Sequence, residues 1–194
     1  MIGPGEIGMA CENQINKHMK RLLILIFLLT CARTVVAQQL RAVQGYVRFF
    51  SGAPIEDITA INEKASGAFD QNTTEVAFLI PIREFEFRKS LMQEHFNENF
   101  MESDRFPEAT FVGKVSGYVP GQSVGQVQTE GELKIHGVTK SVMVPGTIRQ
   151  EGNKLWMEAV FRVKLEDYGI EIPTLLFQNI AEEVEVTVKF EFNR

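Results

Sequence analysis

Short runs of alternating apolar and polar residues make up most of the chain after residue 38. In the clearest run, residues 154–167, every second residue from Leu155 to Leu165 is apolar, and many of the residues between are charged. A period of two places successive side chains on opposite faces of a β-strand. Runs of the same kind span residues 40–51, 65–69, 74–87, 109–118, 125–136, 138–150 and 184–192.

Short segments of turn residues, such as Asp70-Gln71-Asn72 and Glu151-Gly152-Asn153, separate these runs. Helical segments do not alternate with the strands, which excludes a doubly wound fold. The pattern predicts an all-β, mainly antiparallel fold, either a barrel or a sandwich. A barrel of about eight strands either fills its interior with side chains or holds one small ligand.

Two segments depart from the simple alternation. Within residues 74–87, Phe78 lies at an even position and Phe85 at an odd one, so an unbroken strand would place their side chains on opposite faces. We therefore expect a bulge or kink near residues 81–83. Residues 55–64 have too weak a pattern to decide between a short helix and an irregular linker.

Residues 90–102 have the spacing of the single amphipathic helix in the chain. Ser90 is a suitable N-cap, because its hydroxyl can accept a hydrogen bond from a backbone N–H of the first turn. We expect the helix to lie on the sheet or to plug one end of a barrel. Its predicted apolar side consists of Leu91, Met92, His95, Phe96 and Phe100.

Residues 131–140 predict a β-hairpin. Leu133 and Ile135 share one face of its first strand, His136-Gly137 interrupts the run, and β-branched residues resume at Val138. Two strand-like runs around a short turn that contains glycine are typical of a hairpin.

The N-terminus has the features of a secretory signal. Lys20-Arg21 precedes an uncharged apolar run from Leu22 to Leu29, and Val35-Val36-Ala37 offers small residues to a signal peptidase. The run is shorter than the roughly 20 residues that a membrane-spanning helix needs. We therefore predict a leader in residues 1–37, cleaved after Ala37, and one domain in residues 38–194.

The leader leaves two alternatives open. Met19 is an alternative start of translation, because it directly precedes the basic residues of the signal. Cys31 is an alternative site for a lipid anchor, although Thr30 is larger than the residue expected before an acceptor cysteine. We expect the exported domain to be periplasmic and not anchored.

Charge and cysteine content exclude a nucleic-acid-binding protein and a domain held by disulfides. The net charge is −5, and the leader holds more basic than acidic residues, so the exported domain is more acidic than the whole chain. Such a domain lacks the electrostatic footprint of a nucleic-acid-binding protein. Cys11 and Cys31 both precede the expected cleavage site, so the domain would have no disulfide and must be held by its core.

The histidines are the candidates for a catalytic or metal-binding site. A catalytic base at His136 would need a nucleophile and an orienting acid, and only Thr139 and Ser141 lie close in sequence. His95 and His136 lack the spacing of common metal motifs. We therefore predict no catalytic residue, no metal site and no cofactor, and we interpret His136 as a turn residue. A hydrolase or metal enzyme built on His136 and His95 is the less favoured alternative.

Three motifs resemble the YceI-like family, the exported lipid- and polyisoprenoid-binding β-barrels of bacteria. They are Phe106-Pro-Glu-Ala-Thr-Phe111 after the predicted helix, the hairpin Gly131–Lys140, and Asp167-Tyr168-Gly169-Ile170 before the last strand. The resemblance implies a lipocalin-like barrel of about eight antiparallel strands with one amphipathic helix. It also implies an apolar interior that holds a long isoprenoid or fatty chain.

Strand parity, combined with this resemblance, predicts the residues of an apolar cavity. We expect an exported binding protein, not an enzyme, that holds an isoprenoid, quinone or other amphiphilic lipid. The alternative is a structural or stress-related module in which the same residues fill a solid core. An exposed final strand, residues 184–192, would also allow two copies to pair as a homodimer. The expected cavity residues are Phe78, Ile80, Phe96, Phe111, Leu133, Ile135, Phe161, Val163, Val186 and Val188.

Overall fold

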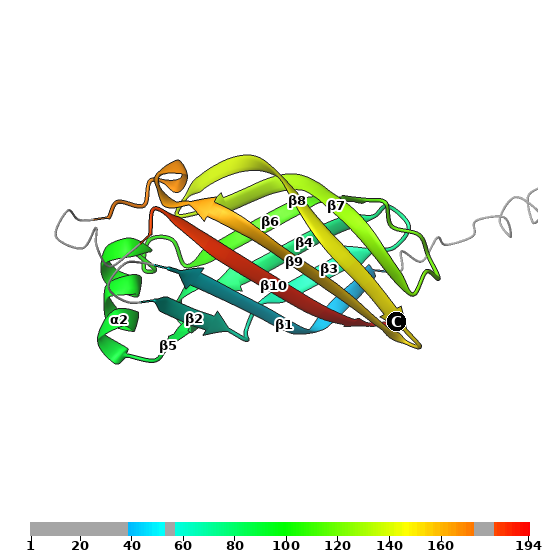
Figure 1. Ribbon diagram of the computed structural model, residues 1–194, viewed down its shortest axis with the longest axis horizontal. Coiled ribbons are helices and arrows are strands. Elements are labelled where there is room, and N and C mark those ends of the chain that lie inside the picture. Colours follow the sequence, from blue (N-terminus) through cyan, green and yellow to red (C-terminus); the bar gives the residue numbers. More distant parts are fainter. Residues whose placement is uncertain (1–38, 53–56, 173–180) are drawn as a thin grey trace, which may run out of the picture. The chain divides into compact units, whose positions relative to one another are not determined.

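A computed structural model describes residues 39–52, 57–172 and 181–194. These residues form one sheet of ten strands and a few short helical segments (Figure 1). The strands are β1 (Gln39–Ser51), β2 (Ile58–Asn62), β3 (Ser66–Asp70), β4 (Glu75–Pro81), β5 (Glu86–Phe87), β6 (Glu108–Ser116), β7 (Val124–Ile135), β8 (Val138–Glu151), β9 (Lys154–Lys164) and β10 (Glu183–Asn193). The helical segments are η1 (Ile82–Glu84), α2 (Ser90–His95), η2 (Phe96–Phe100) and η3 (Leu165–Tyr168).

The sheet closes into an antiparallel barrel because β10 pairs with β1 as well as with β9. Val186 of β10, for example, lies opposite Phe49 of β1 and Phe161 of β9. This confirms the predicted lipocalin-like, eight-stranded β-barrel with one helix. The order around the ring is β1, β3, β4, β6, β7, β8, β9 and β10, while β2 and β5 extend from one edge of β1.

Closure changes the expected role of the last strand. Partners lie along nearly the whole length of both edges of β10, so the prediction that this strand is exposed was wrong. The ladder between β8 and β9 covers only Gly146–Glu151 and Lys154–Ala159, so the ring is not paired along its whole circumference. Homodimer formation itself stays a prediction.

The second edge of β1 changes partner along its length. It pairs with β3 from Gln39 to Arg41 and with β2 from Val47 to Ser51. Strand β2 spans half of residues 55–64, for which the sequence predicted a helix or a linker, so neither prediction was right for residues 58–62. Hydrogen bonding to β1 produces a strand where the local pattern was weak, because strand formation depends on tertiary context.

Asn62 holds the corner at which β2 leaves the barrel. Its side chain is fully buried, and its Nδ2 donates a hydrogen bond of 2.7 Å to the carbonyl oxygen of Pro81. Its Oδ1 accepts a bond of 2.8 Å from the backbone N–H of Lys64. The amide therefore joins β2 to the end of β4 in place of a backbone ladder, and both polar ends of the buried group are satisfied.

The kink expected near residues 81–83 is confirmed. Strand β4 ends at Pro81, and the 3₁₀ turn η1 redirects the chain before β5 begins at Glu86. The turn reverses the parity of the apolar residues, which is why Phe78 and Phe85 differ in phase but both face the interior.

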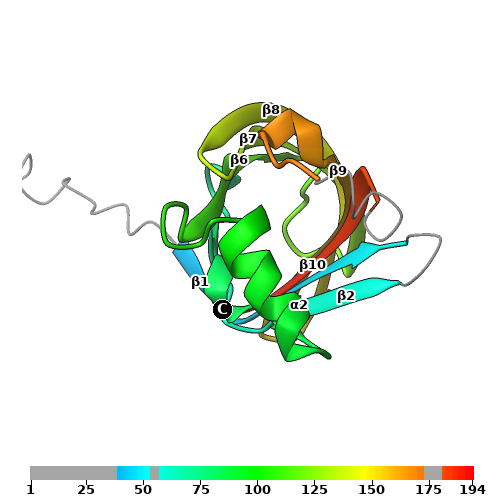
Figure 2. The same cartoon turned by 90° about the vertical axis from the view of Figure 1, so that its left-hand side faces the viewer.

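The helix crosses one end of the barrel (Figure 2). It begins after Lys89, which has an extended backbone (φ −116°), and no side chain caps it, so the predicted N-cap at Ser90 was wrong. It continues as the π-helical segment η2, and Leu91 is 60% exposed instead of facing the barrel. Within the described part of the chain, no helix is long and apolar enough to cross a membrane.

The variant Asn62→Leu tests the corner contact. We expect its free energy of unfolding to fall by about 1–3 kcal/mol, because the Pro81 carbonyl and the Lys64 N–H would lose their buried partner. Urea denaturation gives this value if the slope of the transition is unchanged. Asn72→Ala, in an exposed turn, is the matched control and should change stability by less than about 0.5 kcal/mol. Equal effects of the two variants would contradict the assigned role of Asn62.

Candidate functional site

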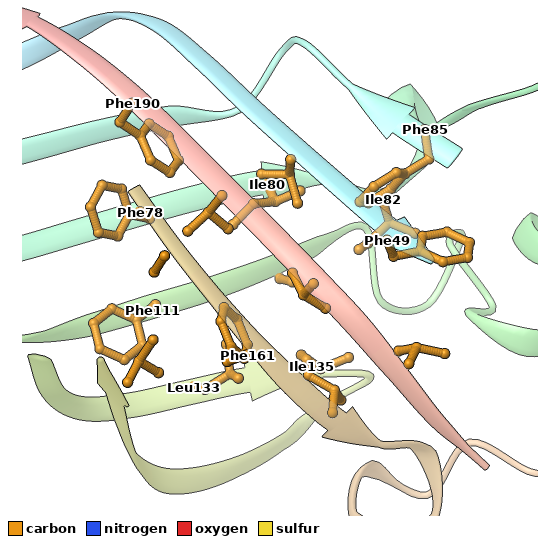
Figure 3. Close-up of a pocket in the computed structure, with 18 of the residues that line it drawn as sticks. Phe49, Phe78, Ile80, Ile82, Phe85, Phe111, Leu133, Ile135, Phe161 and Phe190 are labelled. Carbon is orange, nitrogen blue, oxygen red and sulfur yellow. The ribbon is translucent and has the colours of Figure 1, made fainter. Parts of the chain in front are cut away.

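The barrel encloses a cavity of about 350 Å³ that extends inward from α2 and η2. Apolar side chains from several strands converge on it (Figure 3). Every residue that the sequence predicted for the cavity lines it: Phe78, Ile80, Phe96, Phe111, Leu133, Ile135, Phe161, Val163, Val186 and Val188. Their role in binding a ligand stays a prediction.

Several lining residues were missed by the sequence analysis. Phe49 and Phe190 line the cavity. Each lies two residues along its strand from an inward-facing valine, Val47 or Val188, so continuing the alternation would have predicted both. Ile82 and Phe85 also line it. They lie where η1 interrupts the alternation, so the strand pattern did not predict which way their side chains face.

Three phenylalanine rings lie together in the cavity lining, on the side away from Phe49 and Phe85 (Figure 3). The lining continues past them on their own strands, to Val76 of β4 and Val115 of β6. The ring of Phe78 on β4 stacks on that of Phe190 on β10, with 4.2 Å between the centroids. It also stacks on the ring of Phe111 on β6, at 6.3 Å. We call Phe78, Phe111 and Phe190 the aromatic wall.

Glycines make room for the aromatic wall. A Cβ atom on Gly67 would lie 2.6 Å from the Phe78 ring, and one on Gly131 would lie 2.8 Å from the Phe111 ring. Gly113, directly opposite Gly131 in the ladder between β6 and β7, would also place a Cβ 2.8 Å from the Phe111 ring. Carbon atoms do not pack this closely, so the rings fit only because these positions lack side chains.

Large side chains fill another part of the barrel. Phe69, Leu155 and Phe192 are fully buried there. The ring of Phe69 meets that of Phe192 edge to face at 6.4 Å and that of Tyr118 at 5.2 Å. The expectation of a filled core therefore describes this part of the barrel. The cavity lies beside it, because Val76, the residue opposite Phe69, lines the cavity.

A second aromatic group lies at the end that the helix covers. The ring of Phe96 packs on those of Phe49, Phe85 and Phe87, with centroid separations of 5.5, 5.6 and 5.0 Å. Neither α2 nor η2 contains a fully buried residue. The helical roof is therefore packed less completely than the part of the barrel around Phe69 and Phe192.

The cavity lining carries almost no charge. The carboxylate of Glu158 lies 3.9 Å from Nζ of Lys189, and both side chains are about half exposed, so this charge lies outside the cavity. The hydroxyl of Ser51 accepts a hydrogen bond of 2.9 Å from the backbone N–H of Ala181. Such a lining favours an apolar ligand and penalises a buried charge. Its polar members, among the described residues, are Ser51, His95, Thr129, Thr147 and Glu158.

His136 lies at the rim of the barrel and not in the cavity. It and Gly137 both have positive φ, 49° and 78°, as type I′ hairpin turns require. Its Nδ1 lies 3.3 Å from the carbonyl oxygen of Tyr168, and because a carbonyl only accepts, this bond requires a proton on Nδ1. Its Nε2 lies 3.3 Å from Oε2 of Glu102, within ion-pair reach but without the alignment of a hydrogen bond.

The contacts of His136 give it an architectural role. They join the hairpin between β7 and β8 to η3 and to the loop after η2. The edge of the Phe106 ring also packs against the imidazole, with 4.4 Å between the ring centroids. His136 is thus a turn residue, as the sequence suggested, although its backbone partner is distant in sequence.

Other polar groups near the rim are also structural. A hydrogen bond of 2.7 Å from Nζ of Lys140 holds the pKa of Asp167 below its usual value. Burial raises the pKa of Tyr168. His95 is an exposed residue of the roof itself that also lines the cavity. The described residues contain no group of three or more His, Cys, Asp or Glu side chains arranged to hold a metal ion.

Comparison with known proteins identifies the family. The model of the YceI-like domain matches residues 34–192, so this chain belongs to the YceI-like proteins. UPF0312 proteins of Pseudomonas putida strains W619 and GB-1 are each 30% identical to it over 94 residues. Each of these matches covers 45% of this chain and 47% of the relative, so the alignment spans about half of either protein.

Solved structures show the same fold. A polyisoprenoid binding domain from Saccharophagus degradans, implicated in plant cell wall breakdown, superposes with a TM-score of 0.69 at 19% identity, over 81% of this chain and 98% of that one. BcnA of Burkholderia cenocepacia superposes with a TM-score of 0.65 at 19% identity, over 76% and 95%. A Campylobacter jejuni YceI protein gives 0.54 at 17% identity, over 68% and 80%.

Gly131→Ala tests the packing of the aromatic wall. A Cβ at this position would lie 2.3 Å from the carbonyl oxygen of Val112 as well as against the Phe111 ring. We expect a loss of roughly 1–3 kcal/mol in the free energy of unfolding, as in other overpacked cores.

Gly125→Ala on the same strand is the matched control. Its Cβ would come no closer than 3.5 Å to any neighbour, the flexible side chain of Gln122. In a strand this change should be neutral or slightly stabilising. Thermal or urea unfolding of both variants checks the prediction, and a Gly131→Ala protein as stable as the wild type would show that the wall tolerates a side chain there.

Proposed function

We propose that this protein is exported to the periplasm and there binds and carries an isoprenoid, a quinone or another amphiphilic lipid in its barrel. The observation that carries the proposal is the apolar cavity that extends inward from the helical roof. Its volume of about 350 Å³ falls within the range of small-molecule sites. The predicted leader, which supports export, lies outside the described residues.

Apolar burial alone provides enough free energy for such binding. Each methylene group removed from water contributes about 0.8 kcal/mol. A ligand chain that buries about a dozen of them would gain roughly 10 kcal/mol before the entropic cost of ordering the chain is subtracted. An uncharged chain would lose little polar hydration in a lining with so few polar groups.

The family also supports a binding role. A structural relative of similar fold is a polyisoprenoid binding domain, and the present chain has an open interior where such a ligand would lie. The less favoured hydrolase needs a hydroxyl nucleophile next to a base. Among the described residues, His136 contacts a carbonyl oxygen and a carboxylate at the rim, which is the geometry of a structural contact.

Native mass spectrometry of the purified protein tests the proposal directly. We expect a fraction of molecules to carry a co-purifying lipid that organic extraction removes. Extracted protein should then bind farnesol or geranylgeraniol with micromolar or tighter affinity, measured by displacement of a fluorescent apolar probe. Protein that carries no lipid and binds neither alcohol would refute the proposed function.

A cavity-filling variant locates the binding site. Val188 lines the cavity, so Val188→Trp should occupy part of its volume and weaken isoprenoid binding by at least about tenfold, or 1.4 kcal/mol. Thr187→Trp, at the adjacent and outward-facing position of β10, should bind like the wild type. Equal affinities of the two variants would place the ligand elsewhere, provided that both unfold like the wild type.

A further inference from the structure

We propose that the hydroxyl of Thr129 binds an uncharged oxygen atom of the ligand, such as the hydroxyl of an isoprenoid alcohol or a carbonyl of a quinone. This inference rests on the proposed function. Because Thr129 lies in the inner part of the cavity, the polar end of the ligand would enter the barrel first, and its apolar chain would extend back toward the roof.

Thr129 faces into the barrel. It lies on β7 in the same phase as Val127 and Leu133, which are buried, whereas Gln128 and Glu130 on either side of it are exposed. Thr129 is also one of the residues that line the cavity. Its side chain therefore places a hydroxyl group inside the barrel.

The position of Thr129 is far from the roof. Ile135 marks the roof end of β7, because the next residue, His136, approaches Glu102 in the loop after η2 at 3.3 Å. At a rise of about 3.3 Å per residue, Thr129 lies about 20 Å along β7 from Ile135. A ligand atom that contacts its hydroxyl must therefore reach deep into the cavity.

The hydroxyl of Thr129 has apolar neighbours in the barrel wall. The residues opposite it are Val115 of β6 and Val144 of β8, and both line the cavity. Within the described part of the chain, the side chain of Thr129 forms no hydrogen bond. A valine would have the same shape without a polar atom to desolvate. Threonine at this position therefore costs free energy unless a bound molecule supplies a partner.

The other polar residues of the lining are placed differently. The hydroxyl of Ser51 already accepts a hydrogen bond from the backbone, and His95 is exposed on the roof. Thr147 and Glu158 are opposite each other in the ladder between β8 and β9, and each adjoins a buried inward-facing residue, so their side chains point outward. Among the described residues, Thr129 is thus the polar side chain of the lining that faces the interior away from the roof.

A single hydroxyl suits an uncharged head group. It can donate one hydrogen bond and accept others, so it matches both an alcohol and a carbonyl oxygen. A phosphate or carboxylate buried here would lose its hydration and gain only one partner. The ionisable residues of the lining, His95 and Glu158, lie on the exposed roof and on the outward face. The expected ligand is therefore an isoprenoid alcohol, ketone or quinone and not an isoprenoid phosphate.

Thr129→Val tests the contact with two probes, farnesol and β-farnesene, a hydrocarbon with a chain of the same length. Displacement titrations of extracted protein should show that farnesol binds the variant about three- to tenfold more weakly than the wild type, because one hydrogen bond is lost. β-Farnesene should bind the variant at least as tightly as the wild type, because no hydroxyl is then buried without a partner. A general loss of packing would instead weaken both probes.

Thr187→Val is the matched control, since it makes the same change at an outward-facing position of β10. It should leave the affinity for both probes unchanged. Thr129→Ser, which keeps the hydroxyl, should retain the wild-type ratio of the two affinities, whereas Thr129→Ala should lower the relative affinity for farnesol as Thr129→Val does. Unfolding curves establish that each variant is folded, and the Ser and Ala pair keeps the test decisive if Thr129→Val is not.

The outcomes separate the two proposals. Wild-type protein that binds neither probe would refute the proposed function itself. Wild-type protein that binds farnesol, together with a folded Thr129→Val variant that binds both probes as the wild type does, would overturn the role of Thr129 and leave the lipid-binding function intact. Tighter binding of farnesyl phosphate than of farnesol would overturn the selection of an uncharged head group.

Discussion

Pairing between β1 and β10 is the constraint on which the rest of the molecule depends. It closes the ring, and the number and tilt of strands in a closed barrel fix the width of its interior. Side-chain size then decides whether that width is filled. Large rings fill one part of the interior, around Phe69 and Phe192, whereas the part that extends inward from the helix encloses a cavity. One architecture therefore contains both a solid core that stabilises it and a hollow that can hold a ligand.

The sequence predicted those features that depend on local periodicity. Alternation located the barrel strands, the break after Pro81 and the inward residues of the cavity, because each follows from parity along one strand. It failed at β2, whose strand character comes from pairing with β1, and at the start of α2, which lacks the expected side-chain cap. Whether the interior was open could not be read from parity, since inward residues line a cavity and fill a core equally well.

The other features that the sequence did not predict are contacts between residues that lie far apart in the chain. Phe78 and Phe190 are far apart in the chain, and nothing in either strand reveals that their rings stack at 4.2 Å. The hairpin at residues 131–140 illustrates the same limit. Its sequence predicted a turn, but only the fold shows that Gly131 makes room for Phe111 and that His136 binds the Tyr168 carbonyl. The motif that marks the family thus serves both the wall and the rim.

The two ends of the cavity differ in a way that bears on selectivity. The strands away from the helix hold fully buried rings, Phe69 and Phe192, while the roof formed by α2 and η2 has no fully buried side chain. Elements with few buried contacts open at lower free energy than core elements, so the roof is the end that can yield to a ligand. An apolar lining contributes affinity without recognising a head group. Selectivity among apolar chains inside this barrel must therefore come from the shape of the cavity and from how far the roof yields to a ligand.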